Sequence, residues 1–198
     1  MGKTKERVKS LLKSVIWRLC GVVILVAVTF AYTRSWMQMG LITLVHFLKT
    51  MTIKSIKKDL RVLEIGAGDL KICKQILGNK VKTMDLTGDH DILGDVCNYK
   101  FEPESWDIIF ILEVLEHIPE SQKAIDNIQK ALIKNGMVIA SSPFTFRSHN
   151  PTDYWRFTAD GFKYLFKNFQ ECSVYSTYLN EQERAEHLPL SMFVLAKN

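Results

Sequence analysis

RVLEIGAGD, residues 61–69, is a short run of mainly apolar side chains that ends in two closely spaced glycines. The run 61–65 has the length and composition of a buried strand, and Gly66 would let the chain turn sharply after it. Gly68 removes a side chain at a point where a ligand could approach the backbone. The stretch predicts a strand, a ligand-binding turn and then a helix, as in many nucleotide-binding sheets.

Strand and helix patterns alternate along the chain after this stretch. Asp69 is positioned to cap the first helix, and the mostly apolar run 107–112 is typical of a parallel strand buried on both faces. The expected helices are Leu70–Leu77 and Pro119–Lys134, and the expected strands are Arg61–Ile65, Val81–Met84, Asp107–Leu112 and Met137–Ala140. Such alternation predicts an α/β fold, a parallel sheet with helices on both faces, which binds ligands beyond the carboxyl ends of its strands.

The glycine spacing argues against two familiar phosphate-binding loops. A dinucleotide-binding loop needs a third glycine at position 71, where this sequence has Lys71. The chain also contains no G-x-x-x-x-G-K-[ST] motif. Asp85, at the end of the next expected strand, is placed to accept hydrogen bonds from both hydroxyls of a ribose. The pattern therefore favours a ribose-containing ligand that is not held through a pyrophosphate.

Several spaced motifs together resemble the class I S-adenosylmethionine-dependent methyltransferases. They are Val62–Asp69, Asp85-Leu86, Gly94–Val96, Ser105–Ile109 and Val114–Pro119, within a resemblance that runs from about Leu60 to Asn198. The resemblance implies a Rossmann-like sheet and S-adenosyl-L-methionine as cofactor. The cofactor-binding residues that it implies are Glu64, Gly66, Ala67 and Gly68 for the methionine part, Asp85 and Leu86 at the ribose, and Asp95 and Val96 at the adenine edge.

Methyl transfer from a sulfonium needs alignment of the acceptor and, for some acceptors, a base. The candidates for this base are His117 and His149. The spacing of Glu113, Glu116 and His117 also resembles that in quinone-biosynthesis O-methyltransferases, in which such residues hold a divalent metal, and these ligand types suit one. The favoured interpretation is that this segment orients the next helix and that no metal is used.

A second polar and aromatic cluster follows the strand at 137–140. Asp153, Tyr154 and Arg156 could line an acceptor pocket. Alternatively, Asp153 and Arg156 form a structural pair while Thr158 caps a helix over Ala159–Phe166. The expected sheet is completed by an antiparallel hairpin of Glu171–Tyr178 and Ser191–Ala196.

The first 58 residues differ sharply from the rest of the chain. They hold 11 basic residues and one acidic residue, so the net charge of +5 divides into +10 before residue 59 and −5 after it. Two apolar runs, Val15–Tyr32 and Trp36–Leu48, are separated by a turn with one charge. We predict a transmembrane helical hairpin over residues 1–58, with both ends cytoplasmic because the basic residues flank it. The catalytic domain would then occupy residues 59–198.

Other interpretations of the hairpin stay open. It resembles a small bacterial two-helix membrane domain family over roughly Lys9–Lys58, through Trp17-Arg18, Gly21 and Thr33. The first run could instead be a signal peptide, or a single span followed by an interfacial helix, since the second run is short. The expected location is the bacterial inner membrane with the catalytic domain in the cytoplasm, where the four scattered cysteines would be reduced.

The expected function is methyl transfer from S-adenosylmethionine to a small-molecule, glycan or lipid-linked acceptor, with oxygen favoured as the acceptor atom on family frequency. The alternative is a membrane-tethered module that binds the cofactor and has lost catalysis. Nucleic acid is not an expected partner, because the basic residues lie in the flanks of the hairpin and the remaining chain is acidic. The expected partners are the lipid bilayer and the acceptor.

Overall fold

The computed structural model describes residues 60–145, 148, 152–177, 189 and 191–198. The predicted membrane hairpin lies outside these residues, as do His149 and most of the loop after residue 177. Within the described part of the chain, no helix combines the length and the apolar character that crossing a membrane requires. The hairpin therefore stays a prediction.

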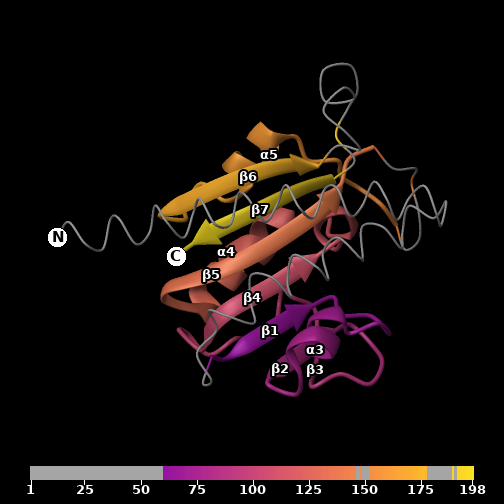
Figure 1. Ribbon diagram of the computed structural model, residues 1–198, viewed down its shortest axis with the longest axis vertical. Coiled ribbons are helices and arrows are strands. Elements are labelled where there is room, and N and C mark those ends of the chain that lie inside the picture. Colours follow the sequence, from indigo (N-terminus) through magenta and orange to yellow (C-terminus); the bar gives the residue numbers. More distant parts are fainter. Residues whose placement is uncertain (1–59, 146–147, 149–151, 178–188, 190) are drawn as a thin grey trace.

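The described residues form one seven-stranded mixed sheet in the order β3-β2-β1-β4-β5-β7-β6 (Figure 1). Its strands are β1 Val62–Ile65, β2 Val81–Asp85, β3 Ile92–Leu93, β4 Trp106–Leu112, β5 Leu132–Pro143, β6 Glu171–Thr177 and β7 Ser191–Lys197. Strands β1 to β5 pair in parallel, and β7 runs antiparallel to both β5 and β6. This confirms the predicted α/β class and the antiparallel hairpin at the end of the chain.

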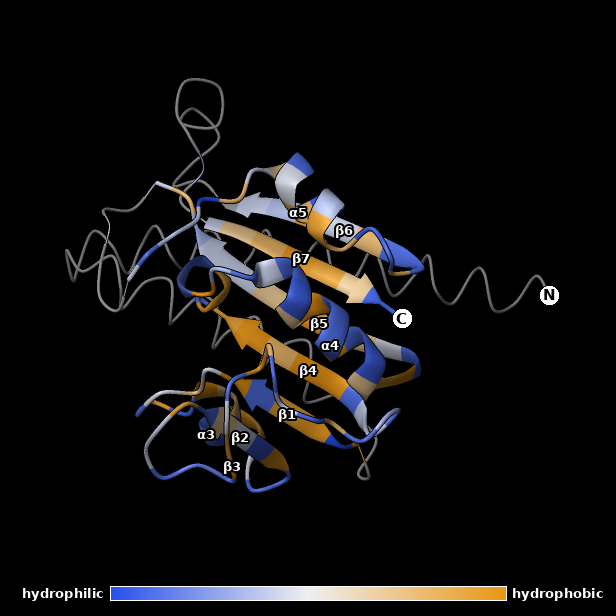
Figure 2. Ribbon diagram, turned by 180° about the vertical axis from the view of Figure 1, so that it is seen from behind, coloured by the Kyte–Doolittle hydropathy of each residue, from blue (hydrophilic) through white to orange (hydrophobic). Residues whose placement is uncertain are grey.

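Helices pack on both faces of the sheet, as Figures 1 and 2 show from opposite sides. Helices α4 (Ser121–Ala131) and α5 (Ala159–Leu165) cover one face, and α3 (Ile72–Leu77) covers β1 and β2 on the other. Neighbouring residues of β1 point to opposite faces of the sheet. Leu63 belongs to the core under α4 and α5, whereas Val62 packs with Cys73 of α3.

The boundary between α4 and β5 differs from the predicted one. Helix α4 ends at Ala131, and β5 starts at Leu132, which pairs with Trp106. The Asn135-Gly136 pair, just past the expected end of the helix at Lys134, is instead an irregularity inside β5, where Asn135 has a positive φ of 65°. The pairing of β5 with β4 shifts register there, so tertiary pairing overrides the helical pattern of the sequence.

Candidate cofactor and acceptor site

The loop after β1 contains two glycines in left-handed conformations, with φ of 67° at Gly66 and 50° at Gly68. The backbone N–H of Gly66 donates to the Met84 carbonyl at 2.8 Å, which ties the loop to β2. A Cβ on Gly66 would lie 2.3 Å from a methyl carbon of Val114, whereas a Cβ on Gly68 would meet no atom within 4 Å. Gly66 therefore serves close packing, and Gly68 leaves open space beside the loop where a ligand fits.

Glu64 is nearly buried and acts as the cap of α3. Its two carboxylate oxygens accept hydrogen bonds from the backbone N–H groups of Cys73 at 2.9 Å and Lys74 at 3.2 Å. Burial raises the pKa of Glu64, although these bonds lower it. The structure thus gives this predicted cofactor residue a demonstrable role in holding the helix behind the glycine loop, and cofactor contact stays a prediction.

The predicted cap at Asp69 and the predicted helix start at Leu70 are wrong. Helix α3 starts at Ile72, and the residue before it, Lys71, has a left-handed backbone with φ 43°. That is the conformation a glycine prefers, at the position where a dinucleotide loop has its third glycine. Lys71 adopts it while its ammonium bonds to Asp89. This ion pair connects the residue before α3 to the segment before β3.

Asp85 links the ends of β1 and β2. Its carboxylate accepts one hydrogen bond per oxygen, from the N–H of Gly68 at 2.9 Å and from that of Leu86 at 2.7 Å. Each oxygen keeps a further lone pair, so the carboxylate can still accept from two ribose hydroxyls. The side chain of Leu86 is 67% exposed next to it and offers apolar surface. Both residues therefore fit the predicted role at the ribose, which nothing in the structure tests directly.

Asp95 and Val96 lie in the turn after β3. The Asp95 carboxylate accepts from the N–H of Cys97 at 2.9 Å and from the Asn98 amide at 2.7 Å, which folds the turn. Asn127 of α4 donates to the carbonyl of the buried Val96 and fixes the turn against the sheet. The turn is thus held rigidly beside the end of β2, and the adenine assignment stays a prediction.

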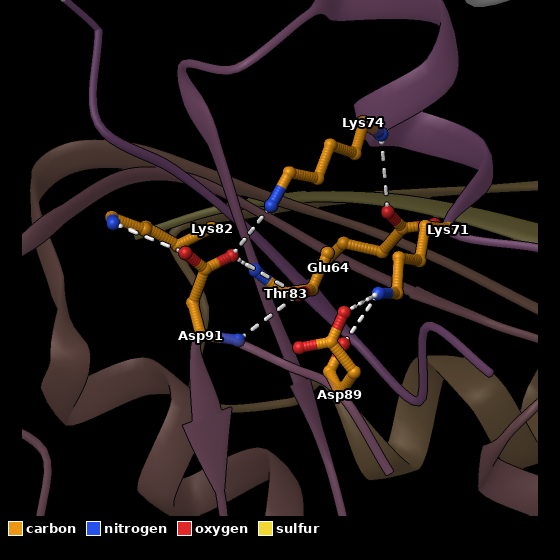
Figure 3. A network of polar contacts seen from close by, with 7 residues as sticks. All are labelled: Glu64, Lys71, Lys74, Lys82, Thr83, Asp89 and Asp91. Atoms are coloured by element: carbon orange, nitrogen blue, oxygen red, sulfur yellow. Dashed lines mark hydrogen bonds and ion pairs between the residues drawn. The ribbon is translucent and has the colours of Figure 1, made fainter. Parts of the chain in front are cut away.

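A network that the sequence analysis did not anticipate surrounds Asp91 (Figure 3). Its carboxylate accepts from the ammonium groups of Lys74 and Lys82 and from the N–H and hydroxyl of Thr83. These bonds, the one from the Thr83 backbone first, hold the pKa of Asp91 well below its usual range. The network connects α3, β2 and the segment before β3 under the glycine loop. No local sequence motif predicts it, because its members are separated along the chain.

A cluster of carboxylates lies just past β4. Glu113 has a positive φ of 54° and is exposed as a residue, but its carboxylate is partly buried where it accepts from the Ser141 hydroxyl at 2.7 Å. Glu116, in the 3-10 helix Leu115–His117, is fully buried, and neither of its oxygens meets a donor in full hydrogen-bond geometry, although its own backbone N–H and the Ser142 hydroxyl lie close enough to lower its pKa. Desolvation by the surrounding protein raises the pKa of each to about 7, with Glu116 adding repulsion on Glu113 and Asp153 adding repulsion on Glu116.

The predicted metal ligands Glu113, Glu116 and His117 do not converge. His117 directs Nδ1 toward the Thr152 carbonyl at 3.0 Å, and its Nε2 lies 3.7 Å from Glu116 Oε1. Across the described residues, no three side chains of metal-ligating type are grouped so that they could hold an ion. The contact of His117 with the Thr152 carbonyl connects this segment to the 152–156 segment, and the predicted role of orienting the next helix stays a prediction. A base role for His117 stays a prediction.

The 152–156 segment is hydrogen-bonded to the backbone just past β4. The N–H groups of Tyr154 and Trp155 donate to the Glu116 carbonyl at 2.7 and 3.3 Å, and the Trp155 indole donates to the Ile118 carbonyl. Arg156 makes a bidentate pair with Asp153 at 2.5 and 2.6 Å. The predicted structural pair is therefore present, and the backbone of Tyr154, a residue that is 50% exposed, is held at the Glu116 carbonyl. Thr158 caps α5 as predicted, accepting from the Gly161 N–H at 3.0 Å.

Comparisons with known proteins agree with this geometry. A family model described as a methyltransferase domain matches residues 50–140. No curated protein matches the chain. Among solved structures, an S-adenosylmethionine-dependent methyltransferase from Archaeoglobus fulgidus is 14% identical, with TM-score 0.58 over 72% of this chain and 87% of that one.

Two further neighbours are described as N-methyltransferases. A methyltransferase from Thermotoga maritima, described as a possible histamine N-methyltransferase, is 14% identical with TM-score 0.57 over 78% of this chain and 91% of that one. A phosphoethanolamine N-methyltransferase from Haemonchus contortus, in complex with phosphomonomethylethanolamine and S-adenosylhomocysteine, is 17% identical with TM-score 0.56 over 73% of this chain and 50% of that one.

The sheet order, the glycine loop and these neighbours define a Rossmann-like methyltransferase fold. With the match to the methyltransferase domain, the chain is an S-adenosylmethionine-dependent methyltransferase, and S-adenosylmethionine is its cofactor. This confirms the predicted enzyme class and cofactor. The cofactor supplies an activated methyl group, and the protein's task is to align the acceptor and manage its proton.

Proposed function

We propose that this enzyme methylates a small-molecule, glycan or lipid-linked acceptor at the cytoplasmic face of a membrane to which residues 1–58 anchor it. The observation that carries the proposal is the pair of apolar runs, Val15–Tyr32 and Trp36–Leu48, with basic residues clustered at both ends and only one in the turn. Such flanks also suit anionic lipid headgroups. A methyltransferase domain joined to this segment would meet acceptors that reside in or near the bilayer.

A small acceptor is supported by the site itself. The carboxyl ends of β4 and β5 bring together the Glu113 carboxylate, the Ser141 hydroxyl and the backbone of the 152–156 segment, which carries the Asp153–Arg156 pair and the half-exposed Tyr154 and Trp155. Few convergent polar groups beside apolar surface are typical of sites for small molecules. The Haemonchus contortus neighbour, which binds a small phosphorylated amine, is consistent with this class.

Topology can be tested by labelling single introduced cysteines with a membrane-impermeant thiol reagent in whole cells. We expect Ser35→Cys, in the turn between the runs, to be labelled in intact cells. Asp160→Cys, on the 93%-exposed side chain at the start of α5, should be labelled only after permeabilisation. The unsubstituted chain gives the background. Labelling of Asp160→Cys in intact cells, or protection of Ser35→Cys, would overturn the proposed arrangement.

The acceptor can be sought by incubating membrane and soluble extracts with methyl-labelled S-adenosylmethionine and purified enzyme. We expect the labelled product to come from the membrane extract. A product that forms only from the soluble extract would contradict a membrane-resident acceptor and would leave the methyltransferase activity itself intact.

A further inference from the structure

A lysine next to the glycine loop reaches across to the segment between β2 and β3. The ammonium of Lys71 donates to the backbone carbonyl of Asp89 and, at 3.2 Å, to the Asp89 carboxylate (Figure 3). Among the described residues, Lys71 alone forms hydrogen bonds with residues 87–90. One side chain therefore provides the polar contacts of this stretch.

The far end of the same segment is held differently. Asp91 accepts from Lys74, from Lys82 and from two donors of Thr83, so that the loss of any one donor leaves the others. Residues 86–89 are exposed. Exposed backbone with few hydrogen bonds is the part of a protein that opens most readily. The order of residues 87–90 should accordingly depend on Lys71 far more than the order of Asp91 depends on any single lysine.

The backbone of Lys71 has an uncommon conformation. Its φ of 43° and ψ of 53° are left-handed, while its N–H donates to the Ala67 carbonyl at 2.9 Å and closes the turn of the glycine loop. A side chain with a Cβ is disfavoured in this conformation, and residues of this kind cluster at functional sites. A glycine would fit the backbone without strain, so any benefit of a lysine here comes from its side chain.

The Lys71 contact runs parallel to the one that shapes the predicted ribose site. The Gly68 N–H donates to the Asp85 carboxylate at 2.9 Å, and Lys71 joins the same two segments a few residues further along each. Leu86, 67% exposed and predicted to lie at the ribose, is on the stretch between these two contacts. The two contacts together therefore fix both ends of the stretch that carries Leu86.

We propose that Lys71 is a positioning residue for the cofactor, which through its bonds to Asp89 orders residues 86–90 beside the glycine loop before S-adenosylmethionine binds. A loop that is already ordered loses less conformational entropy on binding, so the contact raises cofactor affinity. This inference concerns the cofactor side of the enzyme, and it depends neither on the acceptor nor on membrane anchoring.

The first test measures binding of S-adenosylhomocysteine to the full chain in detergent by isothermal titration calorimetry. Lys71→Met keeps a long side chain and removes the ammonium, and it should weaken binding about three- to tenfold, because an exposed ion pair and a charge-assisted hydrogen bond are lost. Lys71→Arg keeps a cation and should retain most of the affinity. Lys163→Met, which breaks an exposed lysine–aspartate pair on α5, is the matched control and should change nothing. Equal affinity of Lys71→Met and the unsubstituted enzyme overturns the proposal.

A glycine variant separates the side chain of Lys71 from its backbone. Lys71→Gly adopts the left-handed conformation without strain, so the variant should fold and keep its stability in urea unfolding. Its affinity for S-adenosylhomocysteine should nevertheless fall as far as that of Lys71→Met. A glycine variant that binds as tightly as the unsubstituted enzyme would show that only the backbone matters here and would overturn the role of the ammonium.

A double-mutant cycle tests the partner. Asp89→Ala removes the carboxylate and keeps the backbone carbonyl that Lys71 also contacts, so it should weaken binding less than Lys71→Met does. In the Lys71→Met background, Asp89→Ala should have little further effect, because the two residues act through one contact. Losses that simply add would contradict the proposal.

Hydrogen exchange followed by mass spectrometry tests the ordering itself. In the cofactor-free enzyme, the amides of residues 86–91 should exchange several-fold faster in Lys71→Met and Lys71→Gly than in the unsubstituted enzyme, whereas those of α4 should be unchanged. Bound S-adenosylhomocysteine should reduce the difference. Equal exchange of residues 86–91 in the variants and the unsubstituted enzyme would show that Lys71 does not order this segment, and the proposal would be wrong.

Discussion

The carboxylate of Asp85 accepts a hydrogen bond from the backbone N–H of Gly68 at 2.9 Å. This contact joins the turn after β1 to the end of β2, the two places between which the ribose of the cofactor is predicted to lie. A second bond, from the Leu86 N–H at 2.7 Å, fixes the other oxygen. Asp85 therefore stabilises the conformation of the cofactor loop even when no cofactor is bound.

Replacing Asp85 by alanine should weaken S-adenosylmethionine binding by roughly 10- to 100-fold. The change removes two acceptors for ribose hydroxyls and frees the Gly68 N–H, and bonds to a charged group contribute about 1.5–3 kcal/mol each. Isothermal titration calorimetry on the detergent-purified chain measures the effect. Asp160→Ala, at an exposed carboxylate of α5, serves as the matched control. An unchanged dissociation constant for Asp85→Ala would remove the ribose assignment.

Features that depend on neighbouring residues in the sequence could be predicted. The apolar runs predicted the parallel strands, the glycines predicted the turn, and Thr158 predicted the cap of α5, because each reflects a local backbone preference. The Asp153–Arg156 pair was also accessible, since three residues separate its members. Local sequence patterns of this kind are enough to predict the strand and the turn that form the cofactor loop.

Features that arise from residues brought together by the sheet could not be predicted. Glu64 caps a helix nine residues away, which no capping motif describes, and Asp91 accepts from donors of two elements, α3 and β2. The exposed and buried positions of Glu113 and Glu116 also depend on how β5 and the 152–156 segment pack on β4. Their raised pKa values follow from that packing and not from the spacing in the sequence.

The two glycines of the loop should respond differently to alanine. At Gly66 a Cβ would meet Val114 at 2.3 Å in a left-handed conformation, so Gly66→Ala should cost more than about 2 kcal/mol of unfolding free energy. At Gly68 the space is open, and Gly68→Ala should cost about 1 kcal/mol from the backbone alone. Urea unfolding compares them. Adding Val114→Ala should recover part of the Gly66→Ala loss, and no recovery would contradict the packing argument.

Removing the hydroxyl that caps α5 should lower stability modestly. Thr158→Ala loses the acceptor for the Gly161 N–H, at a cost of about 1 kcal/mol in urea unfolding. Thr158→Ser keeps the hydroxyl and is the matched control, for which we expect little change. Affinity for S-adenosylmethionine should be the same in both variants, because the cofactor loop lies on other elements. Equal stability of the two variants would show that the cap contributes nothing.

The stability of the folded domain should fall as the pH rises from about 5 to about 7. Glu116 has a pKa of 4.5 when unperturbed and about 7 in the folded protein, so the folded state binds the proton more tightly than the unfolded state does. The stabilisation is complete below pH 4.5 and is lost as the pH passes 7. For a fully buried carboxyl this shift corresponds to about 3 kcal/mol.

Glu116→Gln mimics the protonated carboxyl and should flatten this dependence, so that the variant is more stable than the unsubstituted protein at pH 8. Glu113 and Glu64, whose pKa values are also raised, leave a residual slope of the same sign. Asp91 acts in a different window, because its lowered pKa gives stability that is lost only as the pH falls below about 4. Urea unfolding at pH 5, 6, 7 and 8 separates these contributions, and a stability that rises toward pH 8 in the unsubstituted protein would show that Glu116 is compensated in the folded state.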